Sequence, residues 1–406
     1  MQRFLRPFSF SLMGVIILLL IAGSVVEHIY GTAFAVRYVY TAPWTIALWT
    51  LATVSGLAYL VTIFRTKGWE NLFTFLLHFS FVVILAGAMI THVWGVQGEL
   101  HLRSDKAQTV HSESSVSVFL WDFQVVYAAD GETPVDYITE LRLLDRSREE
   151  TTIDEGTIRM NKPLRYHGYR FCQSDYDSDL NGVVLAYSYD PWGTGVTYAG
   201  YALLLLSIIG FFFQKGTYFR VLWRELIDRS PRAGKVGVGV LAAVIIVLAW
   251  VMTKVVTPKP PLLPVLQTPL LGIHVAVIMM AYTLFGTMMI IGIVGLFMLR
   301  SPATTKRLQT LAQLLLYPAV FCLTIGVFIG AVWANLSWGR YWGWDPKEVW
   351  ALVTLMVYAL MIHTRSIPWL QKPVHYYVAC IVAFVLVLFT YFGVNLILGG
   401  LHSYAN

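Results

Sequence analysis

The chain has 406 residues, of which 57% are hydrophobic and 13% are charged, and its formal net charge is +6. This composition places it among polytopic membrane proteins rather than soluble ones. The positive charge does not indicate a nucleic-acid partner, because lysine and arginine in membrane proteins mostly mark cytoplasmic loops. Its three cysteines lie far apart and form no CxxC motif, so we do not expect the chain itself to carry out dithiol redox chemistry.

Nine apolar runs are long enough to cross a membrane as helices. They cover residues 8–29, 44–64, 72–94, 196–213, 236–256, 273–299, 309–333, 349–363 and 374–397. The first run is too long for a signal peptide, and no small-residue cleavage pattern follows it, so we expect a retained anchor. The predicted fold class is therefore a polytopic α-helical membrane protein with about nine transmembrane helices.

The loops between these runs differ in charge. Lysine and arginine gather in the loops at residues 65–67, 215–235, 300–307 and 365–372, whereas the alternate short loops hold only Arg37, Lys254, Lys259, Arg340 and Lys347. Loops rich in lysine and arginine stay in the cytoplasm. We therefore predict a cytoplasmic N-terminus, with residues 95–195, residues 338–350 and the C-terminus on the outer side.

Residues 95–195 alternate apolar and polar side chains in short runs, which predicts a small β-rich extracytoplasmic insert. Within it, Asp175, Asp177 and Asp179 alternate as in a calcium loop but lack the glycine and final glutamate of an EF-hand, so we expect a solvated turn. We divide the chain into transmembrane helices at 1–94, the insert at 95–195, a transmembrane helix with a basic cytoplasmic linker at 196–235, and a second transmembrane domain at 236–406.

The most unusual stretch reads WGRYWGWDPKEVW and covers residues 338–350 between two apolar runs. Its four tryptophans exceed the single anchors that are common at membrane interfaces. Asp345 as a helix cap, Pro346 at the first helical position and Glu348 three residues after the cap predict a helix with a fixed start. A rigid start would present three indole faces as a shelf for a large, planar, apolar ligand, namely those of Trp338, Trp342 and Trp344.

Four of the ten histidines fall at two matched depths. His78 lies near the cytoplasmic start of the third span, and His363 lies about 27 Å along a helix from Asp345, so both are expected on the inner side. His274 opens the sixth span and His402 follows the ninth, so both are expected at the outer surface beside the tryptophans. We call these two sets the inner pair and the outer pair.

Two neutral imidazoles from different helices are a natural axial arrangement for a haem iron, and haem would also use an aromatic shelf. The pairs therefore predict two haem sites, although each histidine alone would also fit as a polar residue at a helix end. His28 and His92 are interpreted as interfacial residues. Arg340 and Lys347 are either ligands of the haem propionates or plain interfacial cations.

These residues resemble a known family. WGRYWGWDPKEVW, the following ALVTLMVYALMIHTR and the final GGLHSYAN are similar to the WWD domain of haem-handling proteins, specifically CcsA of the System II cytochrome c maturation pathway. The segment LLHFSFVVILAGAMITHVWGVQGELHLR resembles the partner ResB, also called CcsB. The whole chain thus resembles a fused CcsB–CcsA cytochrome c synthetase whose insert is shorter than that of typical ResB proteins.

The resemblance implies that haem b is the transported ligand and substrate. His78 and His363 would correspond to the family's two ligands within the membrane, and His274 and His402 to its external ligands. Haem would pass from the inner to the outer pair, where its vinyl groups form thioethers with the CxxCH thiols of an apocytochrome c. The expected enzyme is a holocytochrome c synthetase of the haem lyase type.

The predicted attachment site contains Arg340 as a haem-binding residue together with four catalytic candidates, Trp338, Trp342, Trp344 and Asp345. The expected partners are apocytochrome c, a thiol-reducing thioredoxin-like protein and membrane lipid, with no nucleic acid. The implied location is the bacterial cytoplasmic (inner) membrane, with the tryptophan stretch and the C-terminus outside.

Two other functions are compatible with the sequence. A haem exporter or chaperone would pass its cargo to a separate ligase, but the fusion of both halves on one chain favours the synthetase. A membrane b-type cytochrome would use His78 and His92, which are 14 residues apart on one helix. No second helix offers a matching pair, which disfavours electron transfer between two stacked haems.

Overall fold

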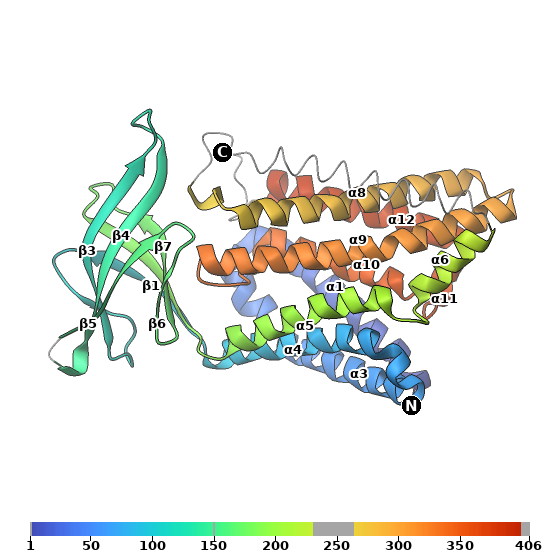
Figure 1. Cartoon of the computed structure of the whole chain (residues 1–406), viewed down its shortest axis with the longest axis horizontal. Coiled ribbons are helices and arrows are strands. Elements are labelled where there is room, and N and C mark those ends of the chain that lie inside the picture. Colours follow the sequence, from blue (N-terminus) through green and yellow to red (C-terminus); the bar gives the residue numbers. More distant parts are fainter. Residues whose placement is uncertain (1, 149–150, 230–263, 399–406) are drawn as a thin grey trace.

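The computed structural model describes residues 2–148, 151–229 and 264–398, which form a bundle of long helices with the β-rich insert at one end (Figure 1). The helical elements before the insert are α1 (Gln2–Tyr30), α2 (Thr32–Ala35), the π-helix η1 (Val36–Tyr40), α3 (Pro43–Lys67), the 3-10 turn η2 (Gly68–Asn71) and α4 (Leu72–Trp94). Those that follow it are α5 (Gly193–Phe213), α6 (Tyr218–Arg229), η4 (Pro264–Leu266), α8 (Pro269–Phe297), α9 (Pro302–Ser337), α10 (Pro346–Ile362), α11 (Pro368–Gln371), α12 (Pro373–Leu388) and the π-helix η5 (Phe389–Leu398).

Seven of the described helical segments are long and apolar enough to cross a membrane, and all seven coincide with predicted runs. The run 349–363 is also helical, but α10 has only 17 residues and is not among the seven. The run 236–256 lies outside the described residues. The structure therefore confirms a polytopic helical membrane protein, whereas the count of nine spans is not confirmed.

Helices from both halves of the chain share common cores. In the C-terminal half, α8, α9, α10 and α12 bury a cluster in which Phe285 stacks on Tyr358 with ring centroids 3.6 Å apart. A second cluster joins α1 to α10, and within it Trp350 Nε1 donates a hydrogen bond of 2.8 Å to Ser24 Oγ. The first helix of the chain therefore packs against the helix that follows the tryptophan stretch.

Helices α4 and α5 approach each other through small residues. A Cβ added at Gly87 of α4 would lie 2.6 Å from the backbone nitrogen of Thr197, and one added at Gly200 of α5 would lie 3.0 Å from that of Ile84. Small residues allow such close backbone contact between membrane helices, where dispersion rather than the hydrophobic effect holds helices together. These two helices flank the insert in sequence, so their contact fixes where both of its ends enter the bundle.

We expect Gly87→Ala to destabilise the protein by about 1–3 kcal/mol, because the added methyl group forces α4 away from Thr197. Gly14→Ala in α1 is the matched control, since a Cβ there meets no atom within 4 Å. Thermal unfolding of the two detergent-solubilised variants measures the difference. Equal unfolding temperatures of the two variants would show that the α4–α5 contact accommodates the added methyl group without loss of stability.

The insert is built from eight antiparallel strands in two four-stranded sheets. Its strands are β1 (Val96–Arg103), β2 (Gln108–Thr109), β3 (Val116–Tyr127), β4 (Pro134–Asp145), β5 (Thr151–Arg159), β6 (Leu164–Tyr166), β7 (Tyr169–Tyr176) and β8 (Gly182–Tyr189). The orders are β1-β8-β7-β6 and β2-β3-β4-β5, and apolar residues of both sheets, including Leu102, Val118 and Phe171, form one core. The predicted β-rich insert is confirmed.

The insert contacts the C-terminal end of α9 directly. Ser337 Oγ donates a hydrogen bond of 2.5 Å to Asn161 Oδ1, and Arg170 Nη1 donates to the backbone oxygen and side-chain oxygen of Asn335. We call this end of the bundle the insert end. The opposite end, where α6 and α11 lie together with the N-terminus, is called the linker end (Figure 1).

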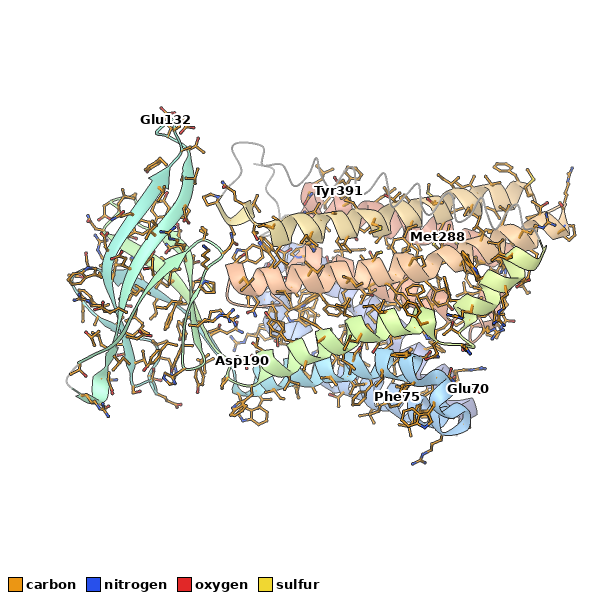
Figure 2. All side chains as sticks on the ribbon, in the orientation of Figure 1. Glu70, Phe75, Glu132, Asp190, Met288 and Tyr391 are labelled. Atoms are coloured by element: carbon orange, nitrogen blue, oxygen red, sulfur yellow. The ribbon has the colours of Figure 1, made fainter. Side chains whose placement is uncertain are left out.

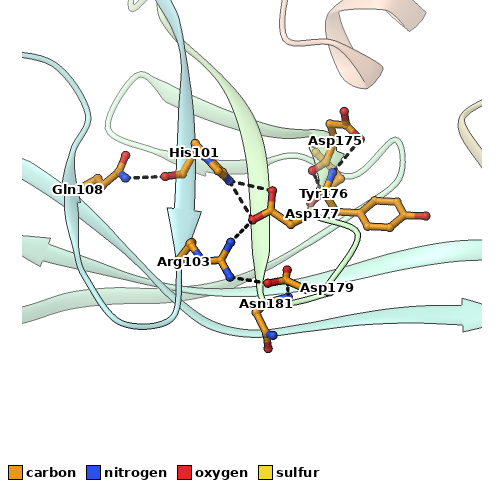
Figure 3. Close-up of polar contacts among 9 residues, drawn as sticks. His101, Arg103, Gln108, Asp175, Tyr176, Asp177, Asp179 and Asn181 are labelled. Atoms are coloured by element: carbon orange, nitrogen blue, oxygen red, sulfur yellow. Dashed lines mark hydrogen bonds and ion pairs between the residues drawn. The ribbon is translucent and has the colours of Figure 1, made fainter.

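The three alternating aspartates lie in the turn between β7 and β8 and at its edges (Figure 3). Asp177 accepts from His101 Nε2 at 2.9 Å and from Arg103 Nη1 at 2.7 Å, while Asp179 pairs with the other terminal nitrogen of Arg103 at 2.5 Å. Hydrogen bonding to Arg103 lowers the pKa of Asp179. Arg103 of β1 thus pairs with two of the three carboxylates, and Asp175 accepts from the backbone nitrogen of Tyr176, which agrees with the predicted turn rather than a calcium site.

Candidate functional site

The tryptophan stretch forms the loop between α9 and α10 at the insert end, and its helix start is capped as predicted. The Asp345 side chain accepts from Lys347 N at 2.9 Å, and Glu348 Oε2 accepts from the backbone nitrogens of Gly343 at 2.8 Å and Asp345 at 3.3 Å. This reciprocal pattern is a capping box, which fixes the first turn of a helix. Asp345 is 3% exposed, so its carboxylate serves the cap from a buried position.

The tryptophans of this loop do not form the predicted flat shelf. The rings of Trp342 and Trp344 meet edge to face, with centroids 5.9 Å apart and planes at 86°. Trp344 has a positive φ of 58°, and this turn stacks its ring on Tyr40 of η1 at 5.0 Å and 10°. Trp338 meets Trp333 of α9 at 4.8 Å and 67°. The indoles therefore give walls of different orientation, because the loop backbone reverses between them.

The structure brings the inner pair together from two distant helices. His78 lies in the second turn of α4 and His363 at the C-terminal cap of α10, and their ring centroids are 6.0 Å apart at an interplanar angle of 73°. A bond between a metal and an imidazole nitrogen is about 2 Å long. Two rings at this separation can therefore bind one metal ion with little side-chain movement.

The hydrogen bonds of three candidate ligands share one pattern. Nδ1 of His78 donates to Thr74 O at 2.8 Å, Nδ1 of His363 to Ala359 O at 2.8 Å, and Nδ1 of His274 to Gly326 O at 2.7 Å. A carbonyl oxygen only accepts, so each Nδ1 carries a proton, and in the neutral form of the ring Nε2 is then the nitrogen with the lone pair. Histidines that bind metals usually have their second nitrogen fixed in this way.

A single cavity of about 1830 Å³ connects the inner pair with the tryptophan loop. Its lining includes His78 and His363 at the linker end and Arg340, Trp342 and Trp344 at the insert end, with mainly apolar side chains of α1, α3, α4, α5, α9 and α10 between them. Along α4, the distance from His78 to His92, which also lines the cavity, is about 21 Å, so the cavity follows most of the bundle. Its volume exceeds the roughly 300–1,000 Å³ of ordinary small-molecule sites.

Two indole nitrogens in the cavity lining have no acceptor among the described residues, those of Trp49 in α3 and Trp342 in the loop. A buried N–H without a partner carries a desolvation cost of about 1–3 kcal/mol, which a bound acceptor removes. A large, flat, mainly apolar molecule with a few acidic oxygens therefore suits this lining. Haem has that character.

The outer pair is placed only in part. His274 lies in α8 at the insert end, as predicted; it is half-buried, and its ring packs against Gly330 of α9. Gly330 of α9 leaves the space that the imidazole occupies, whereas the space beside Gly326 is occupied by Ile278. Among the described residues, His274 is not part of the cavity lining. His402 lies outside the described residues.

Several residues near the loop were not anticipated from the sequence. Tyr341 OH donates to Thr91 Oγ1 at 2.8 Å, and Thr91 in turn donates to Asp190 Oδ2 at 2.7 Å, which links the loop to α4 and to the start of α5. Cys172 of β7 lies 3.3 Å from the Cβ position of Gly339, whose φ is +74°. Burial raises the pKa of the Cys172 thiol to about 12, so it stays protonated near neutral pH. No local motif marks these long-range contacts.

Two family comparisons cover most of the chain. Residues 62–195 match the ResB-like family, and residues 205–402 match the family described as Cytochrome C assembly protein. The boundary between the two matches falls in α5. The cavity described above is lined by helices from both matched regions.

The curated relatives agree with these families. The protein NrfI of Wolinella succinogenes is 41% identical over 156 residues, which are 36% of this chain and 17% of that protein. The cytochrome c biogenesis protein CcsA of Chlamydomonas reinhardtii is 39% identical over 163 residues, 38% of this chain and 45% of that protein. The CcsA of Solanum lycopersicum is 52% identical over 84 residues, 21% of this chain and 26% of that protein. The matched segments thus span less than half of each relative.

The helical bundle, the capped tryptophan loop and the family matches define a multi-pass membrane protein of cytochrome c biogenesis. Within that class, the chain joins a ResB-like region to a CcsA-like region and belongs to the fused CcsB–CcsA proteins of System II. The resemblance inferred from the sequence is thereby confirmed.

Proposed function

We propose that this protein carries haem b from the linker end of the bundle to the insert end and attaches it there to the CxxCH motif of an apocytochrome c. The observation that supports this most is the cavity whose lining includes the inner pair, His78 and His363, and the loop residues Arg340, Trp342 and Trp344. One apolar space with a metal-binding pair at one end and an aromatic loop at the other suits a molecule that is both a metal complex and a hydrophobic plane.

In this proposal the linker end faces the cytoplasm and the insert end faces outward from a bacterial inner membrane. The basic loops at residues 215–235, 300–307 and 365–372 support that orientation. Residues 1–94, 196–235 and 236–406 then form the haem-carrying membrane part, and residues 95–195 form the outer insert.

The attachment reaction adds each cysteine S–H across a haem vinyl double bond. Sulfur bonds to one vinyl carbon and hydrogen to the other, so no atom leaves and no net oxidation occurs. The protein's part is positional: axial histidines hold the iron, the walls formed by Trp342 and Trp344 orient the vinyl edge, Trp338 supports the loop through its contact with Trp333, and Asp345 keeps the loop start fixed. Because both substrate thiols must be reduced, we include a thioredoxin-like reductant as a partner.

Expression of this protein with an apocytochrome c in a host without its own maturation genes tests the proposal. We expect covalent haem on the cytochrome, seen as haem staining after denaturing electrophoresis, and none on a substrate whose two cysteines are serine. Haem bound to the membrane protein without covalent cytochrome would contradict the synthetase and favour an exporter that serves a separate ligase.

A further inference from the structure

The hairpin β6–β7 places two arginines directly opposite each other. Its two-residue turn is His167 and Gly168, with positive φ values of 41° and 89°, and the strand register pairs Arg165 with Arg170. Like charges at directly opposed positions of antiparallel strands destabilise a sheet. This hairpin therefore has an unfavourable pair of like charges within a strand pairing that is only three residue pairs long.

Protein carboxylates do not neutralise this pair within the described part of the chain. No described ion pair involves either arginine, and Arg170 Nε is buried without a hydrogen-bond partner. The nearby carboxylate of Asp190 accepts hydrogen bonds from Gly193 N at 2.7 Å and Thr194 N at 2.8 Å, in addition to the one from Thr91. It caps α5 and forms no described ion pair with either guanidinium group.

Both arginines line a pocket of about 290 Å³ at the junction of the insert and the bundle. Its wall also contains His167, Tyr169 and Asp190, and Figure 2 shows Asp190 at this junction. Burial lowers the pKa of Arg170 and the charge of Arg165 lowers it further, while the charge of Asp190 acts in the opposite direction. A concave site with two guanidinium groups and an unpartnered N–H favours an anion with several oxygen atoms.

The pocket adjoins the insert end of the large cavity. Ser188, Asp190 and Thr194 contribute to the lining of both spaces. Arg340 of the tryptophan loop lines the cavity on the same side. Haem carries two carboxylates on one edge of its plane, so a haem with its apolar part against Trp342 and Trp344 directs acidic groups toward a polar wall.

We propose that Arg165 and Arg170 bind the propionate carboxylates of haem at the insert end of the cavity. This assignment rests on the proposed function and places two residues of the ResB-like region opposite aromatic walls, Trp342 and Trp344, that come from the CcsA-like region. The insert then takes part in orienting haem before attachment, since fixing the propionate edge also fixes the opposite vinyl edge.

The test compares haem with its dimethyl ester, in which both carboxylates are blocked. Both are titrated into the full-length protein in phosphatidylcholine nanodiscs after removal of bound haem. We expect the wild-type protein to prefer haem, Arg165→Gln to reduce that preference about tenfold, and Arg165→Lys to keep part of it. Arg146→Gln is the matched control, because Arg146 is exposed in the same insert and does not line the pocket.

Three outcomes would overturn the assignment. An unchanged preference in Arg165→Gln, with normal binding of haem, removes this assignment alone. A parallel measurement uses nanodiscs that contain phosphatidylglycerol. If Arg165→Gln keeps its preference for haem and loses only the dependence of protein stability on this lipid, the pocket holds a lipid phosphate. Failure of the wild-type protein to bind either compound contradicts the proposed function itself, together with this assignment.

Discussion

His363→Ala is expected to remove haem from the linker end of the cavity, and added imidazole is expected to restore it. His78 and His363 are the paired imidazoles of this end, and each has its Nδ1 proton held by a carbonyl of its own helix. Loss of one ring leaves a space in which free imidazole can bind the iron. The absorption spectrum of the purified protein, recorded with and without imidazole, measures both effects.

His92→Ala is the matched control for this experiment. His92 lies in the last turn of α4 at the insert end. It is exposed, lines the cavity there, and is 14 residues from His78 on the same helix. We expect this variant to retain the haem signal. If His92→Ala removed haem and His363→Ala did not, the inner pair would be wrong and electron transfer across the bilayer would become the better proposal.

His274→Ala is expected to lower formation of covalent cytochrome by at least about tenfold while haem at the inner pair is retained. His274 is fixed between α8 and α9 by its hydrogen bond to Gly326, in the part of the bundle nearest the insert. Loss of a ligand at the attachment site should lower the amount of covalent cytochrome, whereas the absorption spectrum of haem bound at the inner pair should be unchanged. Haem staining of the cytochrome and the spectrum of the membrane protein are read from one culture.

His28→Ala provides the comparison for the His274 variant, because His28 is an exposed residue at the end of α1 on the same side of the bundle. We expect normal cytochrome formation from it. Wild-type amounts of cytochrome from His274→Ala would remove His274 from the proposed mechanism, and a loss of haem from both sites would mark it as a structural residue of the α8–α9 contact.

Local sequence patterns predicted the features that depend on neighbouring residues. The cap at Asp345 follows from residues within one helical turn, and the structure has that capping box. The inner pair was predicted from the rise per residue of a helix. Because every spanning helix crosses the same membrane, this rise gives the depth of residues that are far apart in the sequence. His78 and His363 accordingly meet.

Features that depend on packing between distant segments could not be predicted. The stacking of Trp344 on Tyr40 requires knowledge that η1 lies against the loop, and the opposition of Arg165 and Arg170 requires the hairpin register. The sequence placed His274 at the correct end of the bundle. The orientation of its ring could not be predicted, because it depends on the space beside Gly330 and on the carbonyl of Gly326 in α9. Periodicity and charge counts contain none of this information.

The contact between α1 and α10 has a consequence for biosynthesis. The wall of the cavity includes Phe10 and Met13 from the first helix and Met356 and His363 from one that begins only at residue 346. Because chains enter the membrane from the N-terminus onward, the first helices wait without their final neighbour until most of the chain has been made. A partly synthesised chain thus has a cavity that lacks part of its wall, and the haem-binding space that we propose is complete only when the last helices assemble.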